Sequence, residues 1–278
     1  MKIRTKLFGK GAAWYCAILA AMAGIVVLCS CSINRTSGTK GKPKEIRVLS
    51  YNIQHGEGND DKLDLERTAA TIVAQNPDLV AIQEVDRFAG RTQNIDQAAR
   101  LGELTGMYSV FGKTIPFDGG EYGLVILSKY PIKGHKITQL PQMGDLEDRG
   151  VLEAEIQLDD NRTLLFACTH FCHISEERRI SQAEKINELF AERDGLIILA
   201  GDFNATPEQK PIGVLKAKWS DATNKEPTYP ADNPRRKIDY IFYRPAKMVR
   251  VKETRVINAP MASDHLPLLA VLEINIQC

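Results

Sequence analysis

Six segments with the composition of buried β-strands each carry acidic, amide or imidazole side chains at one end. The rest of each segment is mainly apolar, so its polar end falls beside a hydrophobic core. Burying such groups without partners costs roughly 2–7 kcal/mol each. One shared cleft, in which the polar groups meet one another, is therefore more favourable than six separate burials. The six ends are Asn52, Gln83-Glu84, Thr169-His170, Asp202-Phe203-Asn204, Asp239 and Ser263-Asp264-His265.

The residue types at these ends indicate chemistry with a hard cation. Glu84, Asp264 and Asn52 offer oxygen ligands, which suit Mg²⁺, with Mn²⁺ as the alternative. His170 and His265 lie near acidic residues and are able to contact a phosphate and move protons. No Ser or Cys stands in a recognisable nucleophile motif, so water is the expected attacking group.

The order of elements favours an α/β fold with two packed sheets and helices on the outer faces, because many strands alternate with few helices. A doubly wound nucleotide-binding fold would show a more regular alternation and usually a glycine-rich phosphate loop, which is absent from the sequence. The expected strands are 46–52, 78–84, 122–128, 151–158, 163–170, 196–203, 238–243, 249–257 and 266–274, and the expected helices are 63–75, 97–105 and 175–193.

Seven short strings resemble, in their order, those of the endonuclease/exonuclease/phosphatase superfamily, from about residue 45 to residue 276. The resemblance implies a DNase I-like four-layer α/β sandwich: two mostly antiparallel sheets packed face to face, with outer helices. It also implies that residues 45–278 form a divalent-metal-dependent phosphoesterase domain that uses in-line attack by an activated water. The strings are Ser50-Tyr51-Asn52-Ile53, Gln83-Glu84-Val85, 122–128, Thr169-His170, Gly201-Asp202-Phe203-Asn204, Ile238-Asp239-Tyr240-Ile241 and Ser263-Asp264-His265-Leu266-Pro267.

The same resemblance implies a role for each site residue. Glu84 is the expected principal metal ligand, Asn52 a ligand directly or through water, and Asp264 a ligand or near-ligand. Asp202 is expected to align or deprotonate the attacking water. His265 is the expected catalytic imidazole, and Asp239 the carboxylate that orients it.

Three residues are expected to bind the substrate phosphate. Asn204 and His170 match positions where the superfamily contacts the scissile group, and both also count among the expected catalytic residues. Arg149, 21 residues before His170, resembles the arginine that holds a phosphate oxygen in DNase I-like members. A surface arginine is the alternative interpretation of Arg149, because no distinctive motif surrounds it.

The first 30 residues have the pattern of a bacterial lipoprotein signal peptide. Lys2, Arg4, Lys6 and Lys10 precede an apolar run over 12–28, and the run ends in a sequence that resembles a lipobox. We predict cleavage after residue 30, acylation of Cys31 and a flexible tether over 31–44. The protein would then be a membrane-anchored lipoprotein of the cell envelope, on its periplasmic face or at the cell surface. An uncleaved membrane helix is the alternative.

The charge of the predicted mature chain bears on the substrate. The four basic residues of the signal leave 32 of 36 Lys and Arg against 35 Asp and Glu, which is a net charge near −3. Proteins that bind long nucleic acids usually carry a basic surplus. The favoured substrate is therefore a small-molecule or lipid-borne phosphate, sphingomyelinase-like or inositol-phosphate-like, acted on by a monomer. An extracellular nuclease is the first alternative, and a catalytically inactive binding lipoprotein is the second.

Several other polar residues have structural roles as their default interpretation. Cys168 and Cys172 flank His170, which suggests zinc, but a buried strand with small apolar cysteines is the favoured interpretation. Six residues are candidates for the wall of the cleft, but structural bonds are favoured for His55, Asp86, Arg87 and Arg91, and core or surface packing for Trp219 and Tyr229. His135 and His173 are expected on the surface.

Overall fold

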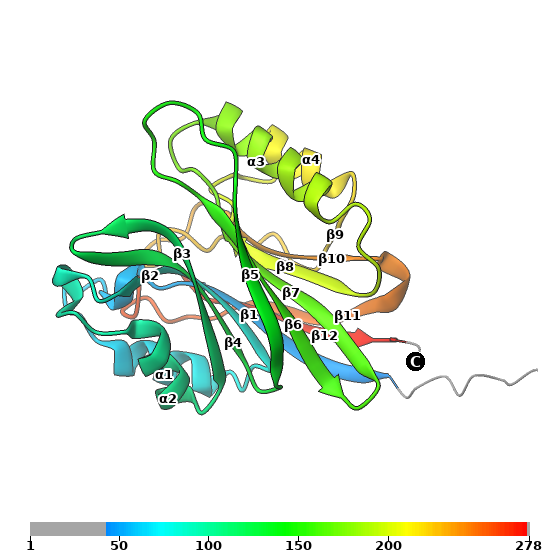
Figure 1. Cartoon of the computed structure of the whole chain (residues 1–278), viewed down its shortest axis with the longest axis horizontal. Coiled ribbons are helices and arrows are strands. Elements are labelled where there is room, and N and C mark those ends of the chain that lie inside the picture. The colour runs from blue at the N-terminus through cyan, green and yellow to red at the C-terminus, as the bar shows by residue number, and fades with distance from the viewer. Residues whose placement is uncertain (1–42, 277–278) are drawn as a thin grey trace, which may run out of the picture. The chain divides into compact units, whose positions relative to one another are not determined.

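The computed structural model describes residues 43–276, in which two six-stranded sheets lie face to face (Figure 1). The predicted signal peptide 1–30, the acylation of Cys31 and nearly all of the predicted tether lie outside the described residues. They remain predictions, as does the assignment of 45–278 as the catalytic domain. In the described part of the chain, no helix combines the length and apolarity needed to cross a membrane.

The first sheet brings the N-terminal strands together with the last two. Its only parallel pair is β1 with β2, and its four other pairings are antiparallel. Its order is β11-β12-β1-β2-β4-β3, built from β1 (Lys44–Asn52), β2 (Leu79–Arg87), β3 (Tyr108–Phe117), β4 (Gly120–Ser128), β11 (Val249–Val256) and β12 (Leu268–Ile274).

The second sheet repeats this plan with the middle of the chain. β7 and β8 form its one parallel pair among four antiparallel pairings. Its order is β5-β6-β7-β8-β10-β9, built from β5 (Ile132–Gln139), β6 (Gly150–Asp159), β7 (Arg162–His170), β8 (Ile197–Asp202), β9 (Ser220–Asp221) and β10 (Asp239–Arg244).

Each parallel pair is joined by a helix that covers the outer face of its sheet. Three of the four α-helices begin at a side chain that accepts a hydrogen bond from the backbone of the first turn, as helix N-termini favour. These caps are Asp64, Asp96 and Ser175. The helices are α1 (Leu65–Ala74), α2 (Gln97–Thr105), α3 (Glu176–Leu189) and α4 (Lys210–Lys216), with single 3₁₀ turns at Gln54–Gly56, Gly90–Thr92 and Ala246–Met248.

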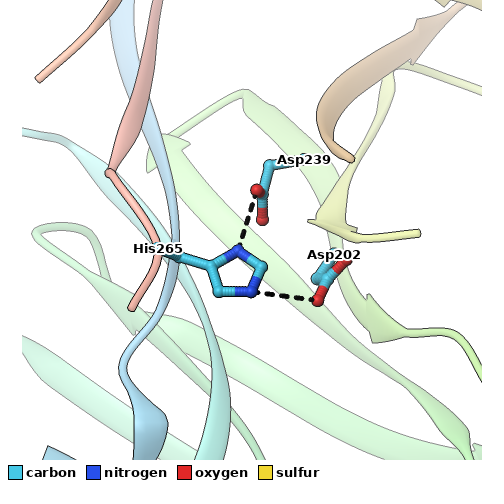
Figure 2. Close-up of side chains that lie close together, drawn as sticks. All are labelled: Asp202, Asp239 and His265. Atoms are coloured by element: carbon cyan, nitrogen blue, oxygen red, sulfur yellow. Dashed lines mark hydrogen bonds and ion pairs between the residues drawn. The ribbon is translucent and has the colours of Figure 1, made fainter. Parts of the chain in front are cut away.

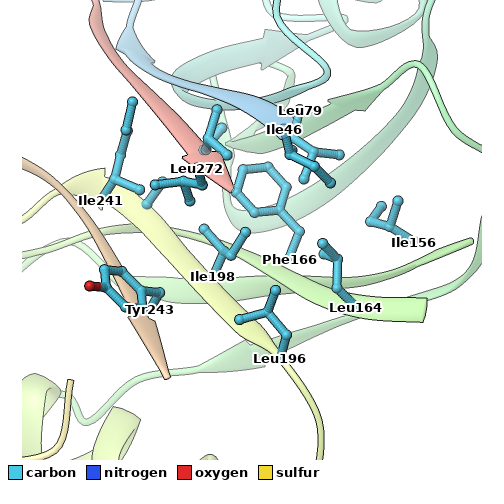
Figure 3. Close-up of a cluster of buried hydrophobic side chains, with 14 of the residues drawn as sticks. Ile46, Leu79, Ile156, Leu164, Phe166, Leu196, Ile198, Ile241, Tyr243 and Leu272 are labelled. Carbon is cyan, nitrogen blue, oxygen red and sulfur yellow. The ribbon is translucent and has the colours of Figure 1, made fainter. Parts of the chain in front are cut away.

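Three buried clusters hold the four layers together. Alternate residues of both sheets meet in the central cluster, where Phe166 of β7 packs among aliphatic side chains (Figure 3). A second cluster joins the first sheet to α1 and α2, and a third joins the second sheet to α3 and α4. Both sheets are therefore apolar on both faces, which leaves their strand ends as the place for polar chemistry.

The fold predicted from the sequence is confirmed: it is the four-layer α/β sandwich with mostly antiparallel sheets. Every predicted strand and helix is present, although α3 ends at Leu189 rather than at residue 193. The sequence did not predict β3, β5, β9 or α4. Most of β5 is exposed and carries little apolar alternation, and α4 is short and contains Pro211 and Gly213.

Candidate active site

A cavity of about 450 Å³ opens where the carboxyl ends of β2, β7 and β8 converge from the two sheets. The β3–β4 hairpin, the loops that follow β2, β7 and β8, and the segments before β6, β10 and β12 form its walls. Its lining consists of Glu84, Arg91, Ile115, Phe117, Tyr122, Glu147, Arg149, His170, His173, Asp202, Asn204, Tyr229, Arg236, Ile238, Asp264 and His265.

Glu84 is turned into this cavity by an irregularity in β2. The pairing of β2 with β4 shifts register between Ile82 and Val85, which places Gln83 and Glu84 in a bulge. Glu84 has a φ of 59°, a left-handed conformation that costs a non-glycine residue roughly 1–2 kcal/mol. Such strain is often found at functional sites, because the carboxylate must point where a regular strand would not send it.

Asn52, at the end of β1, connects Glu84 to the second sheet. Its Nδ2 donates to Glu84 Oε1 at 2.9 Å and to Asp202 Oδ2 at 3.3 Å. Its Oδ1 accepts a hydrogen bond from the backbone N–H of Gln54 at 3.1 Å, which fixes the orientation of the amide. In this arrangement Asn52 orients the two carboxylates, and a direct oxygen contact to a cation would require its amide to turn.

Asp202, at the end of β8, lies at the centre of the site. Its Oδ1 accepts the backbone N–H of Asn204 at 2.8 Å, while Nδ2 of Asn204 lies 3.3 Å from Oδ2. Nε2 of His170 and Nε2 of His265 lie 3.4 and 3.7 Å from the same Oδ2. Burial raises the pKa of Asp202 to about 7, with His265 opposing and Asp239 supporting that shift. A carboxylate with such a pKa suits a general base at neutral pH.

His265 lies between two carboxylates (Figure 2). Its Nδ1 donates to Asp239 Oδ2 at 3.0 Å, and the hydroxyl of Thr228 donates to the same oxygen. Burial alone would lower the pKa of His265, but the charges of Asp239 and Asp202 raise it to about 10. The imidazole therefore carries a positive charge at neutral pH in the metal-free protein.

His170 has the opposite surroundings. Nη1 of Arg149 lies 2.7 Å from its Nδ1, and a guanidinium can only donate, so Nδ1 accepts and the proton is on Nε2. Nε2 faces Asp202 and lies 3.1 Å from Nδ2 of Asn204. Burial, followed by the charge of Arg149, lowers the pKa of His170 well below its usual range. His170 is thus a neutral donor that points into the cavity.

One group of residues among those described has its ligand atoms close enough together to hold a metal ion. One oxygen each from Asp202 and Asp239 and a ring nitrogen of His265 all lie within 4.8 Å of one another. The hydrogen bond and the raised pKa of His265 also fit an ion pair, in which the imidazole binds a proton rather than a metal ion. Glu84 and Asp264, the ligands predicted from the sequence, also line the cavity, and burial raises the pKa of Asp264.

All nine residues predicted from the sequence for this site lie together. Seven of them line the cavity, and the other two, Asn52 and Asp239, contact lining residues from behind. The condition on which the sequence-based argument depended, that Glu84 and His265 share one site, is met. Their chemical roles are not tested by this proximity and remain predictions.

Several residues of the cavity wall had structural or surface roles as their favoured interpretation from the sequence. Arg91 makes the predicted structural pair with Asp86 but also lines the cavity, stacked 4.3 Å from the ring of Phe117. Tyr229 packs 4.8 Å from His265, and His173 is exposed, as predicted, yet contacts Arg149. The usable signal was position in the sequence: His173 follows His170 by three residues, and Tyr229 lies ten residues before Asp239.

The other default interpretations hold. Cys168 is fully buried, its Sγ lies 3.4 Å from the carbonyl oxygen of Ile82, and burial raises its pKa to about 12. Among the described residues, the metal-capable cluster contains no cysteine. Trp219 is buried against Phe190, and His135 is exposed on β5.

Comparison with known proteins gives matches over most of the chain. A profile of the Endonuclease/Exonuclease/phosphatase family matches residues 49–265. A protein of Vibrio campbellii described as a UPF0294 protein is 30% identical over 138 residues, which is 46% of each chain, so the match spans about half the length of that relative.

Two solved structures show the same arrangement of sheets and helices. An endonuclease/exonuclease/phosphatase from Beutenbergia cavernae superposes with a TM-score of 0.72 at 26% identity, covering 84% of this chain and 72% of its own. A mannosyl-6-phosphatase from Bacteroides thetaiotaomicron superposes with a TM-score of 0.68 at 20% identity, covering 82% and 99%. The second likeness concerns the fold alone.

Proposed function

Because this chain belongs to the Endonuclease/Exonuclease/phosphatase family, whose members are hydrolases of phosphoester bonds, we propose that it is a divalent-metal-dependent phosphoesterase. The observation that carries the proposal is the meeting of Glu84, His170, Asp202 and His265 in one cavity, from four separate strand ends. Structural proteins have no need for a partly exposed carboxylate held in a strained backbone beside two buried imidazoles.

The donor set fits Mg²⁺, with Mn²⁺ as the alternative. Glu84 is 27% exposed toward the cavity, and the only side-chain hydrogen bond to it in the described chain comes from Asn52. Asp264 adds a second carboxylate on the lining. Oxygen ligands of this kind are preferred by both cations. When bound, the cation would supply positive charge that stabilises the phosphate oxygens as negative charge develops on them.

Side chains of the protein have separate roles in the rest of the reaction. Asp202 orients the attacking water and accepts its proton, which its pKa near neutrality allows. Asn204 and His170 donate hydrogen bonds to non-bridging oxygens of the phosphate. His265, held as a cation by Asp239, places a fixed positive charge beside the same group. Arg149 keeps His170 in its donor tautomer.

The preferred substrate is a small-molecule or lipid-borne phosphate. The cavity has the size of a small-molecule site, and aromatic rings and arginines line its wall. The fold neighbour named as a mannosyl-6-phosphatase supports a phosphatase on this scaffold. The near-neutral to acidic mature chain argues against a nuclease.

Hydrolysis of p-nitrophenyl phosphate and bis-p-nitrophenyl phosphate tests the proposal. We expect turnover with Mg²⁺, loss of turnover in EDTA and recovery when Mg²⁺ is restored. A second screen should compare nucleic acid, phospholipid, sphingolipid and inositol phosphates. Undiminished hydrolysis in EDTA would reject metal dependence, and inactivity on every phosphoester with metal bound would favour a binding lipoprotein. Cleavage of plasmid DNA alone would reverse the preference among substrates.

We also propose that the protein is anchored to the cell envelope through acylated Cys31. The support is the sequence pattern of residues 1–31. Mass spectrometry of the protein purified from membranes should show a lipid-modified N-terminal cysteine. An intact Met1 would reject the anchor.

A further inference from the structure

Arg149 contacts two imidazoles at different depths of the cavity. Its Nη1 lies 2.7 Å from Nδ1 of His170 on the buried floor, and its Nη2 lies 3.4 Å from Nδ1 of His173 at the exposed rim. Because a guanidinium only donates, Nδ1 of His173 accepts, and the proton of a neutral His173 is on Nε2. Nε2 of His173 has no hydrogen-bond partner among residues 43–276. The site thus has an outer hydrogen-bond donor, His173, as well as the inner donor His170.

Arg236 supplies a positive charge near this outer donor. It is exposed, lines the same cavity, and its guanidinium lies 5.9 Å from the ring centre of Tyr229. Arg179 donates to the backbone oxygen of His173 at 3.2 Å, and its pKa is lowered by burial and also by the charge of Arg236. His173 and Arg236 both line the cavity.

Arg236 also differs from the other two arginines of the cavity. Arg91 forms two hydrogen bonds with the buried carboxylate of Asp86, and Arg149 lies 3.1 Å from Glu147. No carboxylate pairs with Arg236 in the described part of the chain. The cavity wall therefore has one arginine whose charge remains available to a ligand.

We propose that His173 and Arg236 form an outer anion subsite, which binds a second anionic group of the substrate while the scissile phosphate is held at His170 and Asn204. Tyr229 contacts both Arg236 and His265, so the portion of the substrate that joins its two anionic groups would pass near this ring. The substrate class is then a phosphoester with a further phosphate or carboxylate. This inference rests on the proposed function and narrows it.

Competitive inhibition of p-nitrophenyl phosphate hydrolysis, at fixed free Mg²⁺, tests the subsite. Two pairs of compounds differ by one anionic group: glucose 6-phosphate against glucose 1,6-bisphosphate, and glycerol 3-phosphate against 3-phosphoglycerate. We expect the compound with two anionic groups to bind about 10-fold more tightly in at least one pair, as charge-assisted hydrogen bonds allow. The first pair reports a preference for phosphate and the second a preference for carboxylate.

Matched variants identify the residues responsible. Arg236→Gln and His173→Ala should bring the ratio of inhibition constants within each pair close to one. Arg236→Lys should keep part of the preference for the compound with two anionic groups. Arg235→Gln is the control, because Arg235 is an exposed neighbour outside the cavity lining. Hydrolysis of p-nitrophenyl phosphate itself should change little in the Arg235→Gln control. A ratio near one in the wild type, or an unchanged ratio in both Arg236→Gln and His173→Ala, overturns the subsite.

Titration calorimetry separates failure of the subsite from failure of the proposed function. The same four compounds, added to Mg²⁺-loaded protein, give the binding ratio without turnover. Selective binding with no hydrolysis would reject the phosphoesterase and leave the subsite supported. Hydrolysis without selective binding would support the phosphoesterase and reject the subsite.

Discussion

The two sides of the cavity each hold a buried histidine, one neutral and one positively charged. His170 and His265 are 5% and 4% exposed, so burial does not distinguish them. The partner of Nδ1 does: a guanidinium faces Nδ1 of His170, and a carboxylate faces Nδ1 of His265. The pKa of the first imidazole falls and that of the second rises. The charged groups around a buried histidine therefore decide whether it serves as a neutral donor or as a cation.

The largest expected effect is on the carboxylate-rich side. His265→Ala or Asp202→Ala should lower metal-dependent turnover at least about 10³-fold. The first removes the positive charge beside the reacting phosphate, and the second removes the group that accepts the proton of the attacking water. Steady-state hydrolysis of bis-p-nitrophenyl phosphate measures the loss, and circular dichroism with thermal unfolding checks that the variants fold. Turnover near that of the wild type in either variant would refute these roles.

A smaller loss of turnover is expected on the side of the cavity that holds the arginine, and a glutamine substitution should partly restore this turnover. His170→Ala should lower turnover about 10²-fold through loss of one hydrogen-bond donor. His170→Gln should recover much of this, since an amide can donate in place of Nε2–H. His265→Gln should recover little, because an amide carries no charge. Equal behaviour of the two glutamine variants would remove the contrast between the sides.

The smallest effect concerns stability rather than rate, in metal-free protein. The raised pKa of His265 gives stability that is fully present below pH 6.5 and is lost as pH rises through about 10. The lowered pKa of His170 has the other sign: the folded protein keeps this imidazole neutral while the unfolded chain takes up a proton, so stability is lost as pH falls below 6.5. Urea unfolding in EDTA should show that His265→Ala weakens the alkaline decline and His170→Ala the acid one. The reverse pattern would contradict both assignments.

The sequence was informative about the floor of this site because buried strands tolerate few residue types. A carboxylate or imidazole at the end of an apolar run, as with Asp202 or His170, stands out against its neighbours. Short, mostly exposed elements lack that contrast, so β5, with Gly134 and His135 at its middle, gave no signal.

Contacts between neighbouring strands could not be predicted from the sequence, for a different reason. That Arg149 would contact His170 depends on the register of β6 against β7, in which Val151 lies opposite Thr169. The left-handed backbone of Glu84 likewise depends on how β2 fits β4. Both are properties of neighbouring strands, which a single segment does not encode.

The bulge at Glu84 has a consequence for how this protein could be improved. Glycine would adopt the local φ of 59° without a steric penalty, whereas glutamate loses roughly 1–2 kcal/mol. Selection for heat resistance alone should therefore enrich glycine or asparagine at position 84 and yield more stable proteins that lack the proposed metal ligand. Directed evolution of this protein would have to score stability and the proposed activity together.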